Sequence, residues 1–578
     1  MTLVAPLKYS ILLFLALSVL LPLPGTAFAG DHLNGAIGIE PDWSATATID
    51  PAVFPNGRKN IYHWDEETFR IKVQRGQQHA LHYPVPVTGV LMPARPTLRI
   101  LEAKPGQPLF TFMKTLLSLS PDFENFSGFW DWLGLTPPSK ESGEQYPMGV
   151  STLERYGATG VTLSCAACHS SNLFGKPVLG MTNRFPRANL FFIHGKQAVE
   201  KVTPTVFQLM TGSSSSEKMM YADSRNHVHS IGHKKPVTLG LDTSLAQVAL
   251  SLAKRAPNEH ADRNSDYADH PRPNLLDNLV ADSKPAVWWN AKYKTHWLSD
   301  GSVRSGNPVF TNLLWNEIGR GVDLPELVDW MMVNGEIIQD LTTAVFATEA
   351  PKWRDFMGEH TIDIVRAKRG ATSYAQNCAG CHGEVIKAWD LSPIARENIR
   401  QESIRAGEPV PAIIDTIRVK YVEKVKDVGT DPGRRQGMRA LAEGLNPLAF
   451  SKNFGIVIEE QAGYVPPPLV GIWARFPYFH NNSIPNLCAL MTPPAERPIV
   501  YHSGKALDPD RDFDRDCVGY PLNEKTPIAW TKSEEHRYDT RREGMSNSGH
   551  YDRIFTKDGV EKFSAEQKKD LIEFLKTL

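Results

Sequence analysis

The chain has 578 residues, 41% of them hydrophobic, and a formal net charge of −1. This length is too great for a single hydrophobic core and the composition is too apolar for a disordered chain, so we expect two or three folded domains. The balanced charge excludes the electrostatic pattern of a protein that binds nucleic acid or an anionic membrane surface. With 42 Gly, 43 Pro and 13 Trp, the sequence predicts long irregular loops, held by aromatic residues, around a modest helical core.

The first 29 residues have the layout of a secretory signal peptide. One basic residue, Lys8, precedes an apolar run at residues 11–21, and Ala27–Ala29 follows as the site of cleavage. The apolar run is shorter than the roughly 20 residues that span a bilayer, so a membrane anchor is the weaker interpretation. We therefore expect a periplasmic or secreted protein with no stable membrane insertion once the signal is removed.

Residues 30–144 predict an N-terminal segment that is partly extended, because prolines interrupt its apolar stretch HALHYPVPVTGVLMP. Beyond this segment the chain places four of its six cysteines in two copies of the pentapeptide Cys-x-x-Cys-His. The copies consist of Cys165, Cys168 and His169, and of Cys378, Cys381 and His382.

This repeated pattern is the attachment signature of c-type haem. On a helical turn, residues i, i+3 and i+4 lie on one side. The two thiols of one copy can therefore form thioethers with the vinyl groups of one haem while the histidine binds its iron. We predict two covalently bound haem c groups, one at each motif.

Three other uses of paired cysteines explain the pattern less well. A zinc site that pooled both cysteine pairs would leave the two histidines without a purpose. A thioredoxin-like redox pair needs one motif near a βαβ unit and no following histidine. Structural disulfides are common in exported proteins, but they give no reason for a histidine at both fifth positions.

The two motifs divide the remaining chain into two haem regions. Their histidines are 213 residues apart, 382 minus 169, which suits one motif per domain. We predict an N-terminal haem c domain at residues 145–348 and a C-terminal haem c domain at residues 351–578. Small c-type domains are helical shells around the porphyrin. The predicted fold is therefore mainly α, with two cytochrome c-like haem domains, long irregular loops and few short strands.

The second axial ligand of each iron decides function, because a haem closed on both faces carries electrons whereas an open face binds O₂ or peroxide. His480, in GIWARFPYFHNNSIPNL, has an aromatic context, and His550, in GMSNSGHYD, lies in a turn of small residues. Both are candidate ligands, although most histidines are ordinary surface or core residues. Met181 and His194 near the first motif have no distinguishing context, so that iron lacks a dependable second ligand.

The C-terminal region carries two further structural signals. Cys488 and Cys517 lie in a loop-rich stretch and, in an oxidising compartment, predict a stabilising disulfide. Ser564 and Gln567 form a capping box ahead of an apolar face that ends at Leu578, which predicts a final helix.

Together these residues resemble the bacterial di-haem cytochrome c peroxidase superfamily, most closely its rubber (latex-cleaving) oxygenase branch. The resemblance rests on the sequences CAACH, GIWARFPYFHNNSIPNL, RPIVYHSG and SNSGH. It covers mostly residues 145–578 and is most specific toward the C-terminal end, whereas the N-terminal segment is only loosely similar.

The resemblance implies roles for individual residues. His169 would be the proximal ligand of a reactive N-terminal haem whose other face is open or exchangeable. His382 and His550 would ligate a C-terminal haem that stores electrons. An aromatic residue that relays electrons between the haems would correspond to Trp289 or its neighbour Trp288, although core packing explains a tryptophan pair equally well.

Three classes of function follow. The favoured one is a redox enzyme that activates peroxide or O₂ at the N-terminal haem, takes electrons from a small partner protein or small donor, and uses Trp289 and His480 as candidate catalytic residues. Oxygenase-like cleavage of an unsaturated hydrocarbon is an alternative activity that the resemblance raises. A non-catalytic electron-transfer cytochrome is the second class, and a haem-based sensor or scaffold is the third, although no signalling module is visible.

Overall fold

The computed structural model describes residues 40–44, 47, 49–50, 54, 56–116, 128–139 and 142–578. The predicted signal peptide lies outside these residues. The described part of the chain is mainly helical, and its strands are short and pair antiparallel, which confirms the prediction of a mainly α fold. Within these residues, no helix combines the length and the apolar character needed to cross a bilayer.

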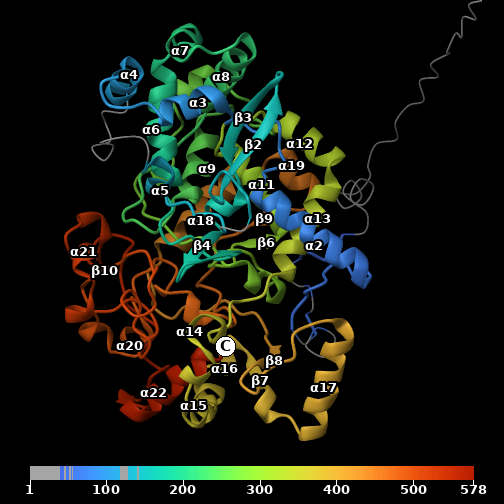
Figure 1. Cartoon of the computed structure of the whole chain (residues 1–578), viewed down its shortest axis with the longest axis vertical. Helices are drawn as coiled ribbons and strands as arrows, with labels where there is room; N and C mark the ends of the chain where they lie inside the picture. Colours follow the sequence, from blue (N-terminus) through green and yellow to red (C-terminus); the bar gives the residue numbers. More distant parts are fainter. Residues whose placement is uncertain are drawn as a thin grey trace, which may run out of the picture.

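The elements up to residue 347 form the upper and central parts of the molecule in Figure 1. They are α2 (Glu66–Leu81), β1 (Met92–Pro93), α3 (Ala94–Leu101), α4 (Pro108–Leu116), α5 (Phe129–Trp132), β2 (Val150–Arg155), β3 (Ala158–Leu163), β4 (Ser170–Leu173), β5 (Lys176–Leu179), α6 (Ala188–Lys201), α7 (Pro204–Thr211), α8 (Ser215–Val228), α9 (Ser244–Ala253), α10 (Ser265–Asp269), β6 (Val303–Ser305), α11 (Pro308–Ile318), α12 (Leu324–Val333) and α13 (Gly335–Ala347). The largest sheet has the strand order β1-β3-β2.

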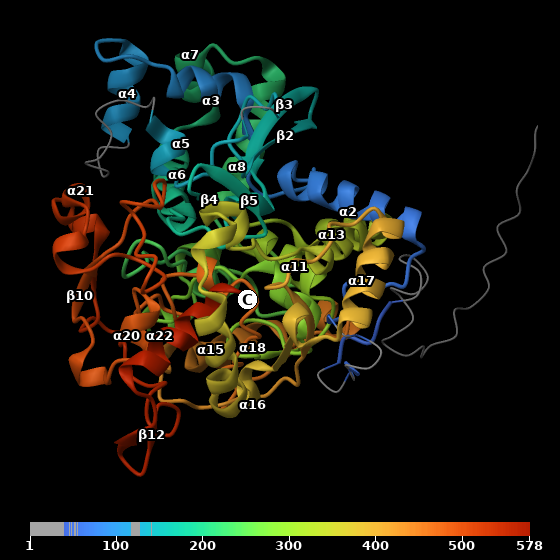
Figure 2. The ribbon, with the colours of Figure 1, turned by 60° about the horizontal axis from the view of Figure 1, so that its bottom comes forward.

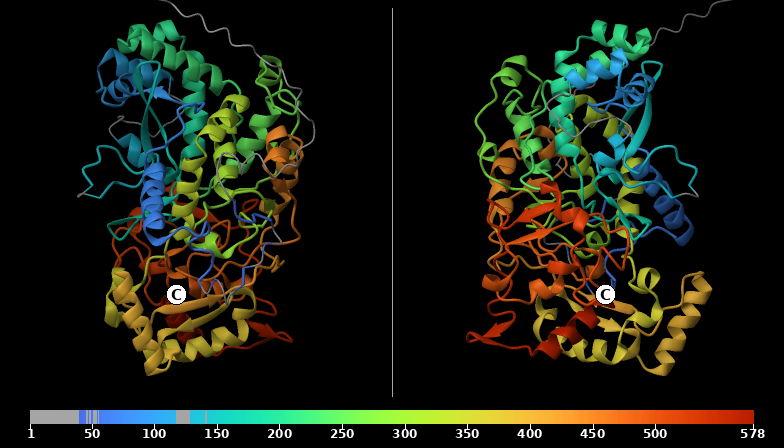
Figure 3. Two further views of the ribbon diagram at one scale, coloured as in Figure 1. Left: turned by 90° about the vertical axis from the view of Figure 1, so that its right-hand side faces the viewer. Right: turned by 60° about the vertical axis from the view of Figure 1, so that its left-hand side comes forward.

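The later elements include most of the lower part of Figure 1. They are α14 (Arg354–Met357), α15 (Ile364–Asn377), α16 (Ala379–His382), β7 (Glu384–Lys387), α17 (Pro393–Ala406), β8 (Thr416–Lys420), α18 (Gly433–Leu445), α19 (Ala449–Asn453), β9 (Val457–Ile458), α20 (Leu487–Leu490), β10 (Val500–His502), α21 (Ile528–Thr531), β11 (Arg537–Asp539), β12 (Thr556–Lys557), β13 (Val560–Glu561) and α22 (Ala565–Lys576). Helix α17 has no buried residue and lies at the edge of the molecule in Figures 2 and 3.

Segments of the two predicted haem regions pack against each other across the predicted boundary. Helix α18 and strand β9, which follow residue 351, pack against α9 and β6, which precede it. Of the two largest hydrophobic cores, one accordingly contains both Phe310 and Leu441, and the other contains Trp289 together with Tyr374 and Leu571. Both cores therefore draw on both regions, and the predicted domain boundaries stay a prediction.

Two helix pairs are built alike, α2 with α13 and α15 with α22. A Cβ on Gly76 would lie 1.9 Å from the carbonyl oxygen of Asp340, and a Cβ on Gly370 would lie 1.9 Å from that of Asp570. Only glycine permits such a close approach of two backbones. Basic residues four positions and one position before each glycine pair with the aspartate: Lys72 and Arg75 with Asp340, and Arg366 and Arg369 with Asp570.

Each helix pair contacts one of the two Cys-x-x-Cys-His motifs. Helix α2 packs on the 3-10 turn η2 (Cys165–Ala167), whereas α15 leads directly into Cys378 and α16. Helix α13 contacts the 3-10 turn η4 (Trp288–Tyr293), and α22 contacts η7 (Ile472–Ala474). The paired helices thus support the segments that form the walls of the candidate site.

Two local predictions for the C-terminal region are confirmed. Cys488 and Cys517 form a disulfide, with 5.1 Å between their Cα atoms. Ser564 caps α22 in a capping box with Gln567, and the predicted apolar face of the helix is buried as far as Leu578.

Candidate functional site

One cavity of about 590 Å³ is lined by all four motif cysteines and both motif histidines. None of these cysteines forms a disulfide. Burial raises the pKa of the Cys165 thiol to about 11 and the pKa values of Cys168 and Cys378 to about 12, so these thiols remain protonated near pH 7. Free, partly buried thiols on the wall of a large cavity fit covalent attachment of a haem.

A zinc site made from both cysteine pairs does not fit this arrangement. Zinc binds thiolates in a tetrahedral cluster. Among the residues that the structure describes, no three His, Cys, Asp or Glu side chains converge so that they could hold a metal ion. The cysteine pairs therefore stand at separate points of the cavity wall, as attachment of a larger cofactor requires.

The first motif begins on η2, in the segment that connects strand β3 of one sheet to strand β4 of another. Nδ1 of His169 is 2.9 Å from the carbonyl oxygen of Ala286. Because a carbonyl only accepts, Nδ1 carries the proton and Nε2 keeps the lone pair that can bind a metal. Burial lowers the pKa of His169, which keeps the imidazole in its neutral, ligating form.

The second motif lies at the end of a helix. Cys378 is the C-cap of α15, and α16 continues to His382. Nδ1 of His382 is 2.7 Å from the carbonyl oxygen of Pro467, so this imidazole also directs an unprotonated Nε2 away from its hydrogen bond. Burial lowers the pKa of His382, and the nearby Arg475 charge lowers it further.

His550 faces His382 across the cavity, with 6.2 Å between the ring centres. Histidine binds a metal at about 2 Å, so two imidazoles on opposite sides of one metal place their ring centres about 6 Å apart. The backbone of His550 has a positive φ of 50°, and its N–H donates to the Val428 carbonyl at 2.7 Å. Burial, with the nearby His382 and Arg497, lowers the pKa of His550 to about 3, which also favours the neutral ligand.

The first motif has no comparable partner among the cavity-lining residues. The ring beside His169 is Trp288, at 5.6 Å between ring centres. Neither Met181 nor His194 lines the cavity. Met181 is buried in a hydrophobic core, and the ring of His194 lies 6.4 Å from Trp132. Among the described residues that line the cavity, no second histidine is paired with His169 as His550 is with His382.

His480 lines the same cavity but is engaged with a tyrosine. Its ring stacks on that of Tyr464 at 4.3 Å, and its Nε2 lies 3.2 Å from the Tyr464 hydroxyl. The Tyr464 hydroxyl donates its one hydrogen to the Asp431 carbonyl. In the hydrogen bond between Tyr464 and His480, Nε2 of His480 must therefore be the donor. Burial, with Arg434 and Lys284 nearby, lowers the pKa of His480 to about 3. The candidate catalytic role of His480 stays a prediction.

The two adjacent tryptophans occupy different positions. Trp288 lines the cavity, whereas Trp289 is fully buried behind it and is not among the lining residues. Trp289 Nε1 donates to the Val470 carbonyl at 2.9 Å. This contact joins the wall segment beside His169 to the segment whose Pro467 carbonyl holds His382.

Polar groups in the cavity wall provide a further test of whether a haem fits. Three buried N–H groups of the cavity wall have no hydrogen-bond partner among the described residues: Nε1 of Trp297, Nε1 of Trp315 and Nη1 of Arg475. Proteins leave few buried donors unmet. These groups fit a ligand that carries acceptors as well as a large apolar surface, as a haem does.

Sequence reasoning missed four residues of this site. The carbonyls of Ala286 and Pro467 orient the two motif histidines, and backbone acceptors leave no signal in side-chain patterns. Lys284 and Arg475 line the cavity as cations. Each is a basic residue within a stretch rich in proline and aromatic residues, SKPAVWW or GIWARFP. A basic residue in such a stretch is the sequence feature that could have indicated a buried cation.

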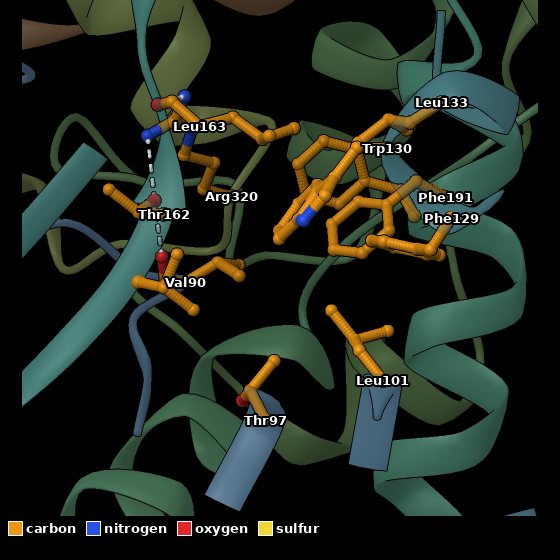
Figure 4. Close-up of a pocket in the computed structure, with 12 residues that line it drawn as sticks. Val90, Thr97, Leu101, Phe129, Trp130, Leu133, Thr162, Leu163, Phe191 and Arg320 are labelled. Atoms are coloured by element: carbon orange, nitrogen blue, oxygen red, sulfur yellow. Dashed lines mark hydrogen bonds between the residues drawn. The ribbon is translucent and has the colours of Figure 1, made fainter. Parts of the chain in front are cut away.

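A second, apolar cavity of about 70 Å³ adjoins the large one near the first motif. The two cavities share Leu163, Phe192 and Arg320 as lining residues. Figure 4 shows Phe129 and Trp130 facing Leu163 and Arg320 across this smaller cavity. The surroundings of the first motif are thus apolar on the side of strand β3.

Comparisons with known proteins agree with part of this site. A family model described as RoxA-like, cytochrome c-like matches residues 463–502, the segment that contains Pro467, Arg475 and His480. The chain is also similar to two uncharacterized proteins of Sinorhizobium fredii (strain NBRC 101917 / NGR234). It is 28% identical to y4iJ over 271 residues and 39% identical to y4iM over 315 residues.

These matches cover parts of the chains. They include 39% and 51% of this chain and 41% and 63% of y4iJ and y4iM, so the chain spans less than two thirds of either relative. The RoxA-like segment supports the rubber oxygenase branch of the resemblance, and it does not extend to the wider di-haem peroxidase superfamily. A cytochrome c-like segment implies covalently bound haem c, and the free cysteines, oriented histidines and cavity provide for it.

Proposed function

We propose that the protein is an exported di-haem c-type cytochrome that acts as a redox enzyme. Cys165, Cys168 and His169 would hold one haem, and Cys378, Cys381 and His382 would hold the other, with His550 as the second axial ligand. Peroxide or O₂ would react at the first haem, and the second would store or relay electrons. The electrons would come from a small partner protein or a small donor.

The difference between the two motifs carries this proposal. His382 faces His550 at the spacing of two imidazoles on one metal, whereas the ring beside His169 is an indole that cannot bind iron. A haem held by His169 alone would supply an iron that can bind O₂ or peroxide. Such an asymmetry is unnecessary in a simple electron carrier.

The residues of this chain prepare the site in two ways. The Ala286 and Pro467 carbonyls fix the protons on Nδ1 of His169 and His382, so both rings offer Nε2 without reorganisation. Burial also disfavours the protonated form of each ring, because it lowers both pKa values. The chain therefore presents ready-made axial ligands.

The tryptophan pair offers a connection between the motifs. The ring of Trp288 lies beside His169, and the indole N–H of Trp289 donates to Val470. Val470 is three residues from Pro467, which accepts from His382. Because His169 is also hydrogen-bonded to Ala286, three residues before Trp289, a path of covalent and hydrogen bonds joins the two motif histidines through Trp289. This path supports Trp289 as a coupling residue.

Cleavage of an unsaturated hydrocarbon is a second candidate activity. The RoxA-like match at residues 463–502 favours it, and so does the apolar cavity beside the first motif. An apolar substrate would be accommodated by such walls. A non-catalytic electron-transfer cytochrome is the alternative if both irons have two protein ligands.

Electron paramagnetic resonance of the resting protein, followed by stopped-flow mixing, tests the proposal. We expect one high-spin and one low-spin haem, and a spectral change at the high-spin haem after mixing with hydrogen peroxide or, in the reduced protein, with O₂. Two low-spin haems that do not react with either oxidant would establish the electron carrier instead. Turnover of polyisoprene under O₂ then separates the oxygenase from the peroxidase.

A further inference from the structure

Lys294 and Lys426 line the large cavity without an ion pair among the described residues, but Glu423 and Asp300 lie near Lys294, and Lys426 is exposed. Three further cations in and beside the cavity have no carboxylate partner. They are Arg184, Lys284 and Arg475, and none of them forms an ion pair within the part of the chain that the structure describes. Lys284 and Arg475 line the cavity, whereas Arg184 does not. Arg320 and Arg434 also line the cavity, but these arginines lie 3.2 Å from Glu317 and 3.5 Å from Asp300.

The polar contacts of the unpaired cations are with neutral groups. Lys284 Nζ donates to the carbonyls of Arg475 and Pro477, at 3.2 and 2.5 Å. Arg184 donates to the carbonyls of Phe476 and Ala474 and stacks over the Phe476 ring. Nη1 of Arg475 is buried without a hydrogen-bond partner among the described residues. The three basic side chains thus meet in one region, and none of them contacts an anion among the described residues.

Such an arrangement is unfavourable by itself. A buried charge costs several kcal/mol unless an opposite charge or several hydrogen bonds compensate it. Burial lowers the pKa of Lys284 well below its usual value, and the charges of Arg475 and Arg184 lower it further. Burial likewise lowers the pKa of Arg475 to about 10. An anion in the cavity would remove this cost.

The positions of Lys284 and Arg475, the two of these three cations that line the cavity, indicate what kind of anion they bind. Lys284 precedes Ala286, which holds His169, by two residues, and Arg475 follows Pro467, which holds His382, by eight. The Lys284 ammonium touches the Arg475 carbonyl, so the walls of the two motifs meet here. Arg475 is close enough to His382 to lower its pKa. An anion that contacts both Lys284 and Arg475 would therefore lie within the cofactor cavity, on the side of the second motif.

We propose that Lys284 and Arg475 bind a propionate carboxylate of the haem attached at Cys378 and Cys381. A haem carries propionate side chains on the edge opposite its thioether bonds, so one end of the cofactor is fixed covalently and the other by charge. Arginine suits this role because its planar guanidinium can donate two parallel hydrogen bonds to one carboxylate. The inference rests on the haem attachment proposed above.

The pair has a consequence for the redox chemistry. A positive charge near the iron favours the reduced state, which carries one positive charge fewer. Loss of Arg475 or Lys284 would also leave the propionate charge uncompensated. Both effects act in the same direction, so the cations hold the midpoint potential of this haem above the value it would have without them.

Spectroelectrochemical titration of the purified holoprotein tests the proposal. We expect Arg475→Gln and Lys284→Gln to lower the midpoint potential of the low-spin haem, and Arg475→Lys, which keeps the charge, to restore most of it. Lys426→Gln is the matched control, because Lys426 also lines the cavity but is exposed to solvent. Its loss should change the potential much less, since solvent screens exposed charges.

Several outcomes would overturn the proposal. One is an unchanged low-spin potential in both glutamine variants with haem still attached. Another is a wild-type potential that depends on chloride concentration, because the counter-ion would then be a solvent anion. If Arg475→Gln yields no holoprotein, the midpoint potentials of Lys284→Gln and Arg475→Lys test the proposal in its place. Mass spectrometry keeps the two proposals apart: absence of haem in the wild type refutes the haem attachment, whereas normal haem content with an unmoved potential refutes only the propionate site.

Discussion

The two Cys-x-x-Cys-His motifs share their local chemistry and differ in what stands opposite. Each motif histidine donates a hydrogen bond from Nδ1 to a backbone carbonyl. Each motif is also supported by a pair of helices that cross at a glycine. The first motif, however, lies on a 3-10 turn between strands and has Trp288 beside its histidine. The second ends a helix and faces His550.

This difference shows where specialisation arises. The attachment chemistry is encoded within five consecutive residues, so it is repeated without change. The residue that faces the motif histidine comes from far along the chain: His550 lies 168 residues after His382, 550 minus 382. A protein can therefore keep two identical attachment motifs and assign them different tasks by altering a distant loop.

The largest expected effect comes from removing one attachment site at a time. Cys165→Ala with Cys168→Ala should remove one haem and the high-spin signal, and Cys378→Ala with Cys381→Ala should remove the other haem and the low-spin signal. Mass spectrometry of the denatured protein counts the haems, and electron paramagnetic resonance assigns them. A wild-type chain with fewer than two haems, or loss of the same signal from both double variants, would end the comparison.

Replacing His550 should make the two motifs alike. Without its second imidazole, the iron held by His382 loses a strong axial ligand, so His550→Ala should convert the low-spin signal into a second high-spin signal. His480→Ala is the matched control, since His480 lines the cavity but is engaged with Tyr464. If His550→Ala leaves the spectrum unchanged and His480→Ala alters it, the ligand is His480.

The tryptophan pair tests whether the two haems work together. Trp289→Phe keeps most of the buried volume but removes the N–H that donates to Val470. It should spare folding and both haem spectra while slowing electron transfer between the haems and turnover with peroxide. Stopped-flow spectra follow each haem separately. Trp288→Phe is the comparison: a normal rate in Trp289→Phe together with a slow rate in Trp288→Phe would move the connection to Trp288.

Local features could be predicted from the sequence, and long-range ones could not. The Cys488–Cys517 disulfide and the capping box of α22 depend on compartment chemistry or on neighbouring residues, and the structure confirms both. The two Cys-x-x-Cys-His motifs line one cavity, and haem attachment at them stays a prediction. His550 was singled out by its turn of small residues, and its positive φ gives that context a physical reason.

The features that sequence reasoning missed involve backbone atoms or packing across the predicted boundary. A carbonyl acceptor such as that of Pro467 has no side-chain signature. The packing of α18 against α9 joins residues on opposite sides of the predicted boundary, and neither helix shows this in its own periodicity. The helix pairs were also missed, because the aspartate that completes each pair lies about 200 residues or more from its glycine.

The smallest expected effect concerns the glycine crossings that the two regions share. A methyl group on Gly76 or Gly370 would lie 1.9 Å from a carbonyl oxygen of the partner helix, so the helices must separate. Overpacking of this kind costs about 1–3 kcal/mol, so Gly76→Ala and Gly370→Ala should each lower the free energy of unfolding by that amount.

Gly195, within α6, is the control, because its nearest neighbour would be 4.0 Å away. Gly195→Ala should raise stability by about 0.4–1 kcal/mol, since alanine restricts the unfolded chain. Denaturant unfolding of the holoproteins measures all three. Equal losses at Gly76 and Gly370 would show that both helix pairs support their motifs alike, whereas a loss at only one would restrict that role to a single region.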